Sequence, residues 1–311
     1  MHSEESGFLM AFPPRPTRRP LTDRVPAWSL AVVSITSVQL GAALSTGLFP
    51  AVGTAGAAWL RLTAAAAIFL TIARPRPSDV PRRAVPAILA LGVVTATMTV
   101  ATLAALDRIA LGTAVAIQFL GPLSVAAARA RRAAMLAWPA LALIGVVLLT
   151  QPWQGRFDPM GVVYALIGAF AWGAYILLTQ RIGDQVAGLK GLALTIPIAA
   201  LVSALIGVPQ ALGGLTWQVL LAFVGLAVLL PVLPFSLEML ALRRLTAHAF
   251  GTLMALEPAI AMVVGAVVLH QVPGPGQLLG IALVVTAGVG AERGGHRDTD
   301  PESLGIPVPE A

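Results

Sequence analysis

The sequence predicts an all-α membrane protein of ten transmembrane helices, arranged as two inverted five-helix repeats with both termini cytoplasmic. Composition, the spacing of the apolar runs and the placement of Lys and Arg predict this fold. Of the 311 residues, 57% are hydrophobic and only 11% are charged, and the mean hydropathy is +0.85. In soluble domains roughly a quarter of all residues are charged. The much lower fraction here indicates that lipid surrounds most of this chain.

Ten apolar runs of membrane-spanning length follow one another along the chain. The first has about 22 residues, too many for the apolar core of a signal peptide, so we expect it to stay in the membrane. Cytoplasmic tails, residues 1–26 and a disordered 292–311, flank the runs. The runs are residues 27–48, 54–73, 86–106, 110–128, 133–150, 160–180, 188–208, 216–241, 246–269 and 275–291.

Nearly all the basic residues lie in the tails and in every second connection between the runs. This distribution predicts how the chain is oriented in the membrane. The side opposite the N-terminus carries only Arg108 and Arg156, and Arg61 lies inside a run. Cytoplasmic loops are enriched in Lys and Arg, so both termini are predicted to be cytoplasmic. The enrichment of cytoplasmic loops in Lys and Arg also explains the net charge of +6. We expect no nucleic-acid partner, because no aromatic residues are interleaved with the basic ones. The N-terminal side carries Arg15, Arg18, Arg19, Arg24, Arg74, Arg76, Arg82, Arg83, Arg129, Arg131, Arg132, Arg181, Lys190, Arg243, Arg244, Arg293 and Arg297.

An internal repeat relates the two halves of the chain. Residues 108–122 align without gaps to residues 244–258, each beginning with Arg and ending with Pro. The repeat unit is therefore five spans, 27–150 and 160–291. Because five is odd, the second unit enters the membrane from the opposite side. Such inverted repeats are typical of secondary transporters, which bind substrate near the midplane between the repeats and expose it alternately to each side.

Glu257 is the most informative polar residue, because it falls near the middle of the run 246–269. A charge at that depth costs at least ~3 kcal/mol by insertion scales. Glu257 is predicted to bind a substrate amine or to carry a coupling proton; the alternative is a structural carboxylate bonded to neighbouring helices. Pro258 leaves the carbonyl four residues earlier without a donor, and Pro122 does the same for the carbonyl of Gln118. Two symmetric polar notches could therefore frame one site.

Other polar residues in the runs have competing interpretations. Arg61 is either a clamp for a substrate carboxylate or counter-charge for Glu257, or a side chain that snorkels to the headgroups. Glu238 is interpreted mainly as an interfacial ion-pair partner of Arg243 and Arg244. Candidates that line a cavity, or simply pack, are Gln39, Trp172 and Tyr175. Cysteine is absent, and the His residues lack a second ligand at metal spacing, so no metal site and no cofactor are expected.

Several stretches resemble the EamA-type members of the drug/metabolite transporter superfamily, and most of all a bacterial subgroup that exports threonine and homoserine. The resemblance covers essentially all ten spans. The chain departs from the family in having Gln118 where such exporters carry Glu, and Leu269-His270-Gln271 where the family often has a Gly-Glu pair. The matching stretches are Trp59-Leu-Arg-Leu62, residues 112–123, residues 175–182, residues 236–245 and residues 249–259.

This resemblance implies a multi-pass exporter of small amino acids in the bacterial inner membrane, driven by protons. Its partners would be the small-molecule substrate, protons and the lipid bilayer, with a homodimer left open. Export of another metabolite or drug is the main alternative, because one fold serves many substrates. A passive channel would not need Glu257 to titrate. The runs contain no catalytic set of side chains, so an enzyme is not expected.

Overall fold

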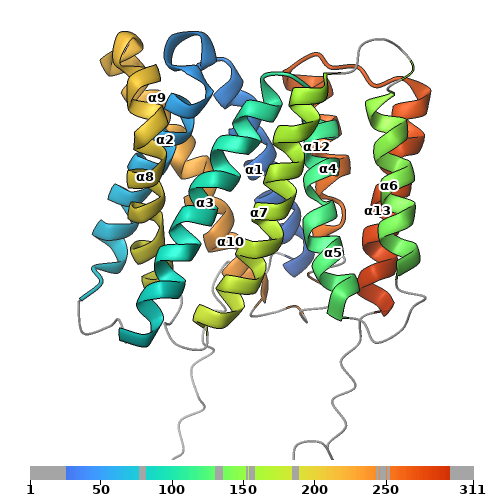
Figure 1. The fold of residues 1–311 in the computed structure, drawn as a ribbon, viewed down its shortest axis with the longest axis horizontal. Coiled ribbons are helices and arrows are strands. Elements are labelled where there is room, and N and C mark those ends of the chain that lie inside the picture. Colours follow the sequence, from blue (N-terminus) through green and yellow to red (C-terminus); the bar gives the residue numbers. More distant parts are fainter. Residues whose placement is uncertain are drawn as a thin grey trace, which may run out of the picture.

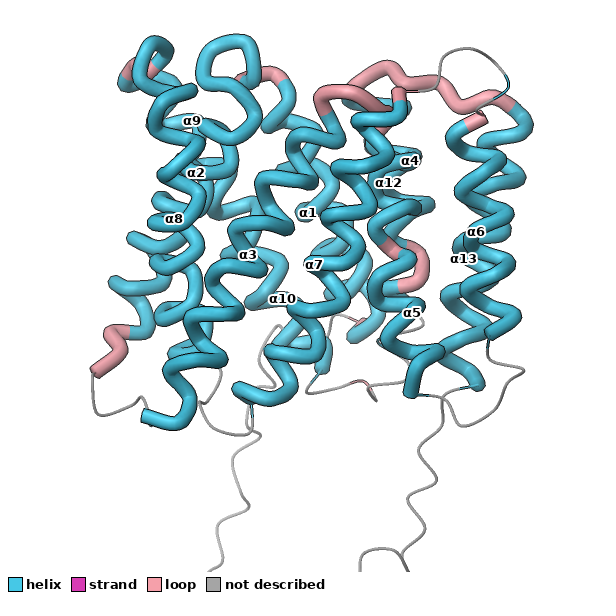
Figure 2. Tube along the Cα trace, viewed as in Figure 1, coloured by secondary structure: helices cyan, strands magenta, loops and turns pink. Residues whose placement is uncertain are grey.

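The computed structural model describes residues 26–76, 82–129, 136–151, 153, 158–183, 189–242, 245, 250 and 253–294. Within these ranges the chain is a bundle of helices joined by short connections, without a strand (Figures 1 and 2). The predicted all-α fold is confirmed. Of the predicted tails, residues 1–25 and 295–311 lie outside the described residues, and α13 extends three residues beyond the predicted end of the last run.

The helices follow the apolar runs in order. Six helical segments of the described chain are long and apolar enough to cross a membrane, and four shorter apolar segments accompany them. The helices are α1 (Ala27–Thr46), α2 (Phe49–Ala73), α3 (Val85–Leu106), α4 (Leu111–Gln118), α5 (Leu120–Arg129), α6 (Ala137–Thr150), α7 (Pro159–Gly183), α8 (Leu189–Ala211), α9 (Trp217–Ala227), α10 (Leu233–Leu242), α12 (Glu257–Val268) and α13 (Pro275–Gly294).

Three of the runs are interrupted rather than continuous. A turn at Phe119 separates α4 from α5, and a π-helical turn, Val228–Val232, separates α9 from α10. A turn at Ala255–Leu256 precedes α12, so Glu257 begins a helix and does not lie midway along one, as the run 246–269 had predicted. Proline explains this correction: Pro258 disrupts a helix interior but is well tolerated in the first turn.

The two halves of the chain interdigitate. The most extensive helix contacts all pair a helix of residues 27–150 with a helix of residues 159–294. Buried apolar clusters therefore draw side chains from both halves: one includes Leu103 and Phe223, and another includes Phe69. The pairs are α2 with α8, α3 with α7, α6 with α13, α3 with α8, α1 with α10 and α4 with α12.

The outer surface of the bundle is apolar. Phe170 on α7 is 82% exposed, and Leu201 and Leu205 on α8 are 73% and 79% exposed. In water, an apolar surface of this kind would be an aggregation liability. Lipid is a suitable surrounding for it, because helices bond their backbone polar groups internally. The chain is therefore a multi-pass membrane protein.

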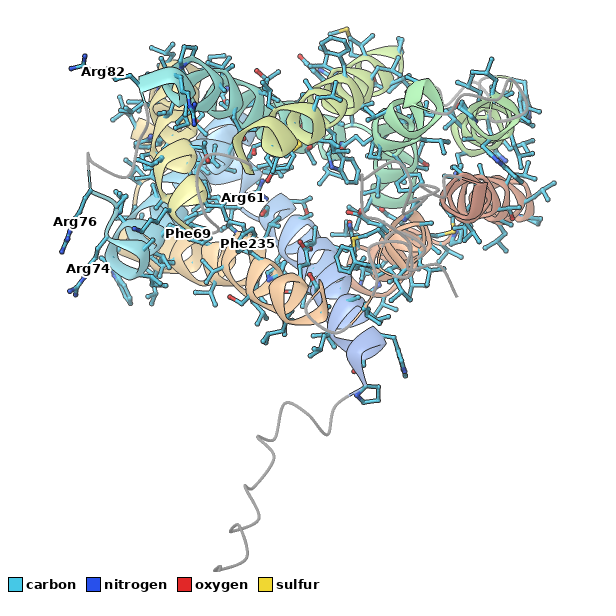
Figure 3. The ribbon with its side chains drawn as sticks, turned by 90° about the horizontal axis from the view of Figure 1, so that it is seen from below. Arg61, Phe69, Arg74, Arg76, Arg82 and Phe235 are labelled. Carbon is cyan, nitrogen blue, oxygen red and sulfur yellow. The ribbon has the colours of Figure 1, made fainter. Side chains whose placement is uncertain are left out.

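The two edges of the bundle differ. α1 begins and α13 ends at the lower edge, whereas the α1–α2, α3–α4, α8–α9 and α12–α13 connections run along the upper edge (Figure 1). Seen from below, Arg74, Arg76 and Arg82 project from the periphery, and Arg61 lies among the helices (Figure 3). These three arginines flank the α2–α3 connection, at the edge where the described chain begins and ends.

Candidate functional site

A cavity of about 510 Å³ lies inside the bundle, within the size range of small-molecule sites. It is bordered by helices of both halves. The structure brings all seven candidate side chains to its wall, together with the kink residue Pro122, although they are scattered over more than 200 residues of sequence; whether they bind substrate stays a prediction. These seven are Gln39, Arg61, Gln118, Trp172, Tyr175, Glu238 and Glu257.

Glu257 faces the cavity from the first position of α12. The Nε2 atom of Gln39, a residue only 2% exposed on α1, donates a hydrogen bond to Glu257 Oε1 at 3.0 Å. The N-terminal end of a helix favours negative charge. The break before Pro258, which is itself buried, therefore places a carboxylate at a helix end that stabilises it, inside a cavity.

Glu238 adds a second carboxylate to the same cavity from α10. Ser34 Oγ on α1 donates a hydrogen bond to Glu238 Oε1 at 3.0 Å. The residues expected to pair with it, Arg243 and Arg244, lie outside the described residues. Glu238 thus belongs to the cavity wall, which the interfacial interpretation had not anticipated.

Arg61 on α2 is buried in the protein, with 6% of its surface exposed, so it does not snorkel to the headgroups. Its Nη1 atom has no hydrogen-bond partner among the described residues. No described carboxylate lies within 4.0 Å of the guanidinium, so Arg61 and Glu257 do not form a direct ion pair. A buried cation without a partner is strongly unfavourable, which marks a group suited to an anionic ligand.

Gln118 closes α4 at the break before Phe119. Thr102 Oγ1 lies 3.2 Å from Gln118 Oε1, whereas Gln118 Nε2 is buried without a partner among the described residues. Trp172 packs edge-on against Phe119, with ring centroids 6.3 Å apart. Trp172 therefore lines the cavity and also packs against the break, so both of its interpretations apply.

Hydroxyl side chains of the cavity were missed in the sequence. Thr95, Thr99 and Thr102 line it from α3, and Thr195 does so from α8. The spacing of four and three residues places the α3 threonines on one helix face, and this is the signal that could have revealed them. Polar residues on one face of an otherwise apolar span point to a protein-lined interior.

A hydroxyl group of α1 also satisfies the interrupted segment between α9 and α10. Ser37 Oγ donates to the carbonyl oxygen of Leu229 at 2.7 Å. Carbonyls released at a break must find donors inside the protein, because lipid offers none. Ser37 therefore stabilises irregular backbone beside the cavity.

The upper edge is closed by polar contacts between the halves. Gly53 on α2 has a positive φ of 68°, a conformation that favours glycine and interrupts the helix. Just after this break, the backbone amide of Ala55 donates to the side chain of Gln210 in the other half. A second hollow, of about 480 Å³, is lined by residues of two further contacts, Arg108 with Asp158 and Gln277 with Leu149. The contacts join Arg108 Nη1 to Asp158 Oδ2 (3.1 Å), Leu111 N to Gln271 Oε1 (3.0 Å), Gln277 Nε2 to Leu149 O (3.3 Å) and Ala55 N to Gln210 Oε1 (3.0 Å).

Asp158 is held ionised at this edge. The backbone amide of Gly161, which donates to Asp158 Oδ1 at 2.9 Å, lowers the pKa of Asp158 most, and the Arg108 guanidinium lowers it further against an opposing effect of desolvation.

In the described part of the chain, no group of three or more His, Asp or Glu side chains is placed to hold a metal ion.

Comparisons with known proteins agree with this architecture. The EamA-like transporter family model matches residues 159–290. The chain is 34% identical to the threonine/homoserine exporter RhtA of Escherichia coli strain K12 over 91% of its own length and 98% of the exporter. Its identity to the exporter of the same name from Salmonella typhimurium strain LT2 is also 34%, over 87% and 93% of the two chains.

A solved crystal structure has the same fold. It matches with a TM-score of 0.58 and 20% identity, over 84% of this chain and 95% of its own. The resemblance seen in the sequence is confirmed by the curated relatives, and the family consists of transporters, which also confirms that the chain is not an enzyme. The chain belongs to the EamA-like transporter family.

Proposed function

We propose that this protein exports small amino acids of the threonine and homoserine type from the cytoplasm in exchange for protons. The observation that carries the proposal is the cavity in which a buried guanidinium without a partner and two carboxylates face the same space. A free amino acid is a zwitterion and offers one charge of each sign. The names of the relatives point to the same substrates.

The charges in the cavity assign a role to each end of the substrate. The guanidinium of Arg61 suits a planar carboxylate, to which it can donate two hydrogen bonds. Glu257, oriented by Gln39, receives the ammonium group, and Glu238 adds negative charge on that side. Because no direct ion pair joins Arg61 to Glu257, the substrate does not have to displace one before it binds.

Proton coupling follows if one carboxylate serves two ligands. An ammonium group and a proton both neutralise Glu257, so they compete for it. Release of the amino acid outside then favours uptake of a proton there, and release of that proton inside frees the carboxylate for the next substrate. A chain with these steps would convert an inward proton gradient into amino-acid export.

The inverted repeat is supported by the helix contacts. Exchanging each helix for its predicted counterpart maps the pairs α2–α8, α4–α12 and α6–α13 onto themselves and interchanges α3–α7 with α1–α10. The break at Phe119 corresponds to the turn at Ala255 at the repeat offset. We therefore propose ten spans in two inverted repeats, 27–150 and 160–291. In this proposal the basic lower edge faces the cytoplasm, an orientation that suits a protein of the bacterial inner membrane.

Alternating access is supported by the position of the contacts between the halves. The hydrogen bonds of the upper edge join elements of opposite halves, and a buried apolar cluster that includes Phe49, Leu103 and Leu111 accompanies them. In the proposed orientation this edge is periplasmic, so the structure represents a state closed to the outside. Export requires these contacts to separate while the substrate remains between the halves.

Efflux from proteoliposomes tests the proposal. The purified full-length protein is reconstituted with labelled threonine or homoserine inside, with and without an imposed pH gradient, beside empty liposomes. We expect gradient-stimulated efflux that Glu257→Gln abolishes and Asp107→Asn, an exposed acidic residue of the α3–α4 connection, leaves unchanged. Efflux of both amino acids that ignores the pH gradient would indicate a passive channel. Absence of flux would redirect the search to another metabolite or drug.

A further inference from the structure

The amide of Gln118 is a buried group that the binding of a zwitterion does not use. Gln118 is only 6% exposed, and its Nε2 atom has no hydrogen-bond partner among the described residues. A buried donor left without an acceptor destabilises the protein, because it has lost its hydrogen bonds to water without replacing them. Such a group is expected where a ligand supplies the missing acceptor.

The orientation of this amide is fixed from two sides. Thr102 on α3 places its hydroxyl 3.2 Å from Gln118 Oε1. On the other side α7 approaches closely, because a Cβ atom added to Gly168 would lie 3.1 Å from Gln118 Cδ and 3.3 Å from Nε2. The amide is thus held between α3 and the bare backbone of α7, and its Nε2 donor is left without a partner among the described residues.

Two other hydroxyl groups of this wall offer acceptors. Thr95 and Thr195 each direct their hydroxyl hydrogen to a carbonyl oxygen of their own helix, at 2.7 and 3.0 Å. Their oxygen atoms keep lone pairs for a ligand. Apart from the charged side chains, the wall therefore combines the unused amide donor of Gln118 with acceptor oxygens, a combination that suits a hydroxyl group and does not suit a methyl group.

We propose that Gln118 Nε2 donates a hydrogen bond to the side-chain hydroxyl of the transported amino acid and thereby determines the preference for hydroxyl amino acids over their apolar isosteres. This inference rests on the proposed export function, and it assigns the selectivity to a residue that the charged groups do not require. The substrate hydroxyl accepts from the amide and donates to a threonine oxygen. Valine, which carries a methyl group where threonine has the hydroxyl, leaves the amide without an acceptor.

The test compares threonine with valine in proteoliposomes of the full-length protein, each labelled and measured as an initial rate of efflux. We expect the wild type to prefer threonine by about tenfold or more, since sites that bind a substrate hydroxyl reject analogues lacking it. Gln118→Leu is expected to bring the ratio close to one while valine efflux is retained. Thr102→Val is expected to lower the ratio less, because it only releases the amide. Thr97→Val removes an exposed hydroxyl on the same helix and should change nothing.

Each outcome supports or contradicts the assignment of hydroxyl selectivity to Gln118. A preference for threonine in the wild type that persists in Gln118→Leu would overturn the assignment and leave amino-acid export standing. Efflux of neither amino acid by the wild type would overturn the export function and this inference with it. If Gln118→Leu does not insert into membranes, the ratio in Thr102→Val against Thr97→Val gives the answer, and equal ratios in these two variants contradict the inference.

Discussion

The cavity and the upper edge of the bundle treat their polar groups in opposite ways. In the cavity, Arg61 Nη1 and Gln118 Nε2 are buried without partners among the described residues. At the upper edge, side chains such as Gln271 and Asp158 form hydrogen bonds across the two halves. Both regions are built from helices of both halves, so the difference does not come from the architecture. In the proposed function, the cavity is the ligand site and the upper edge is the closed side of the transporter.

This difference indicates where the protein is stable and where it is active. An unsatisfied buried group destabilises the empty protein and binds a ligand that satisfies it, so stability and function oppose each other there. A satisfied contact between halves stabilises one conformation and must break during transport. Substitutions in the two regions should therefore give opposite signs in stability measurements.

Arg61→Met is expected to have the largest effect. Loss of the guanidinium should reduce threonine efflux at limiting substrate about 30-fold or more, corresponding to ~2 kcal/mol of binding. The same change should raise the melting temperature of the ligand-free protein, because it removes a buried charge without a partner. Added threonine should stabilise the wild type and not the variant.

Efflux assays and thermal unfolding in nanodiscs measure both effects of this substitution. Arg82→Met, at an exposed position of the lower edge, is the matched control and should behave as wild type. A destabilised Arg61→Met protein that exports normally would show that the arginine is structural and that the comparison between the two regions fails.

Gln271→Leu is expected to have an intermediate effect of the opposite sign. It leaves the amide of Leu111, at the start of α4, without its acceptor and should destabilise the protein by about 1–3 kcal/mol. It should also populate the state open to the upper side. Because the chain has no cysteine, Thr113→Cys provides a unique label beside the second hollow, and its reaction with an impermeant maleimide should accelerate. Gln218→Leu, an exposed residue of α9, should leave both readouts unchanged.

Asp158→Asn is expected to have the smallest effect and to show the pH dependence. Gly161 and Arg108 lower the pKa of Asp158 below its ordinary value of 3.8. The stabilisation is therefore present above that value and is lost as the pH falls through the lower pKa of the folded state. The melting temperature of the wild type should exceed that of Asp158→Asn slightly at neutral pH, and the difference should vanish in acid. A difference that grows on acidification would contradict this assignment.

Several residues of the cavity can be identified from the order of amino acids alone, because their chemistry is out of place in lipid. Glu257 and Arg61 are ionisable groups inside apolar runs, and such groups seldom occur there without a partner or a cavity. Gln118 is recognisable from its position in the repeat beside Pro122. The ion pair of Glu238 with Arg243 and Arg244 stays a prediction, because these arginines lie outside the described residues. That Glu238 lines the cavity was not evident from the basic residues that follow it, because proximity along a chain says little about which face of a helix a side chain occupies.

The sequence by itself determined the all-α class, the positions of the apolar runs and the family, because hydropathy and family motifs are local properties that a single chain displays. Only the tertiary structure decided that α12 begins at Glu257, that the threonines of α3 face the cavity, and that Arg61 remains apart from Glu257. These features depend on the rotation of each helix about its axis and on where helices of opposite halves meet. In a helix that is apolar on nearly all sides, no periodicity records that rotation.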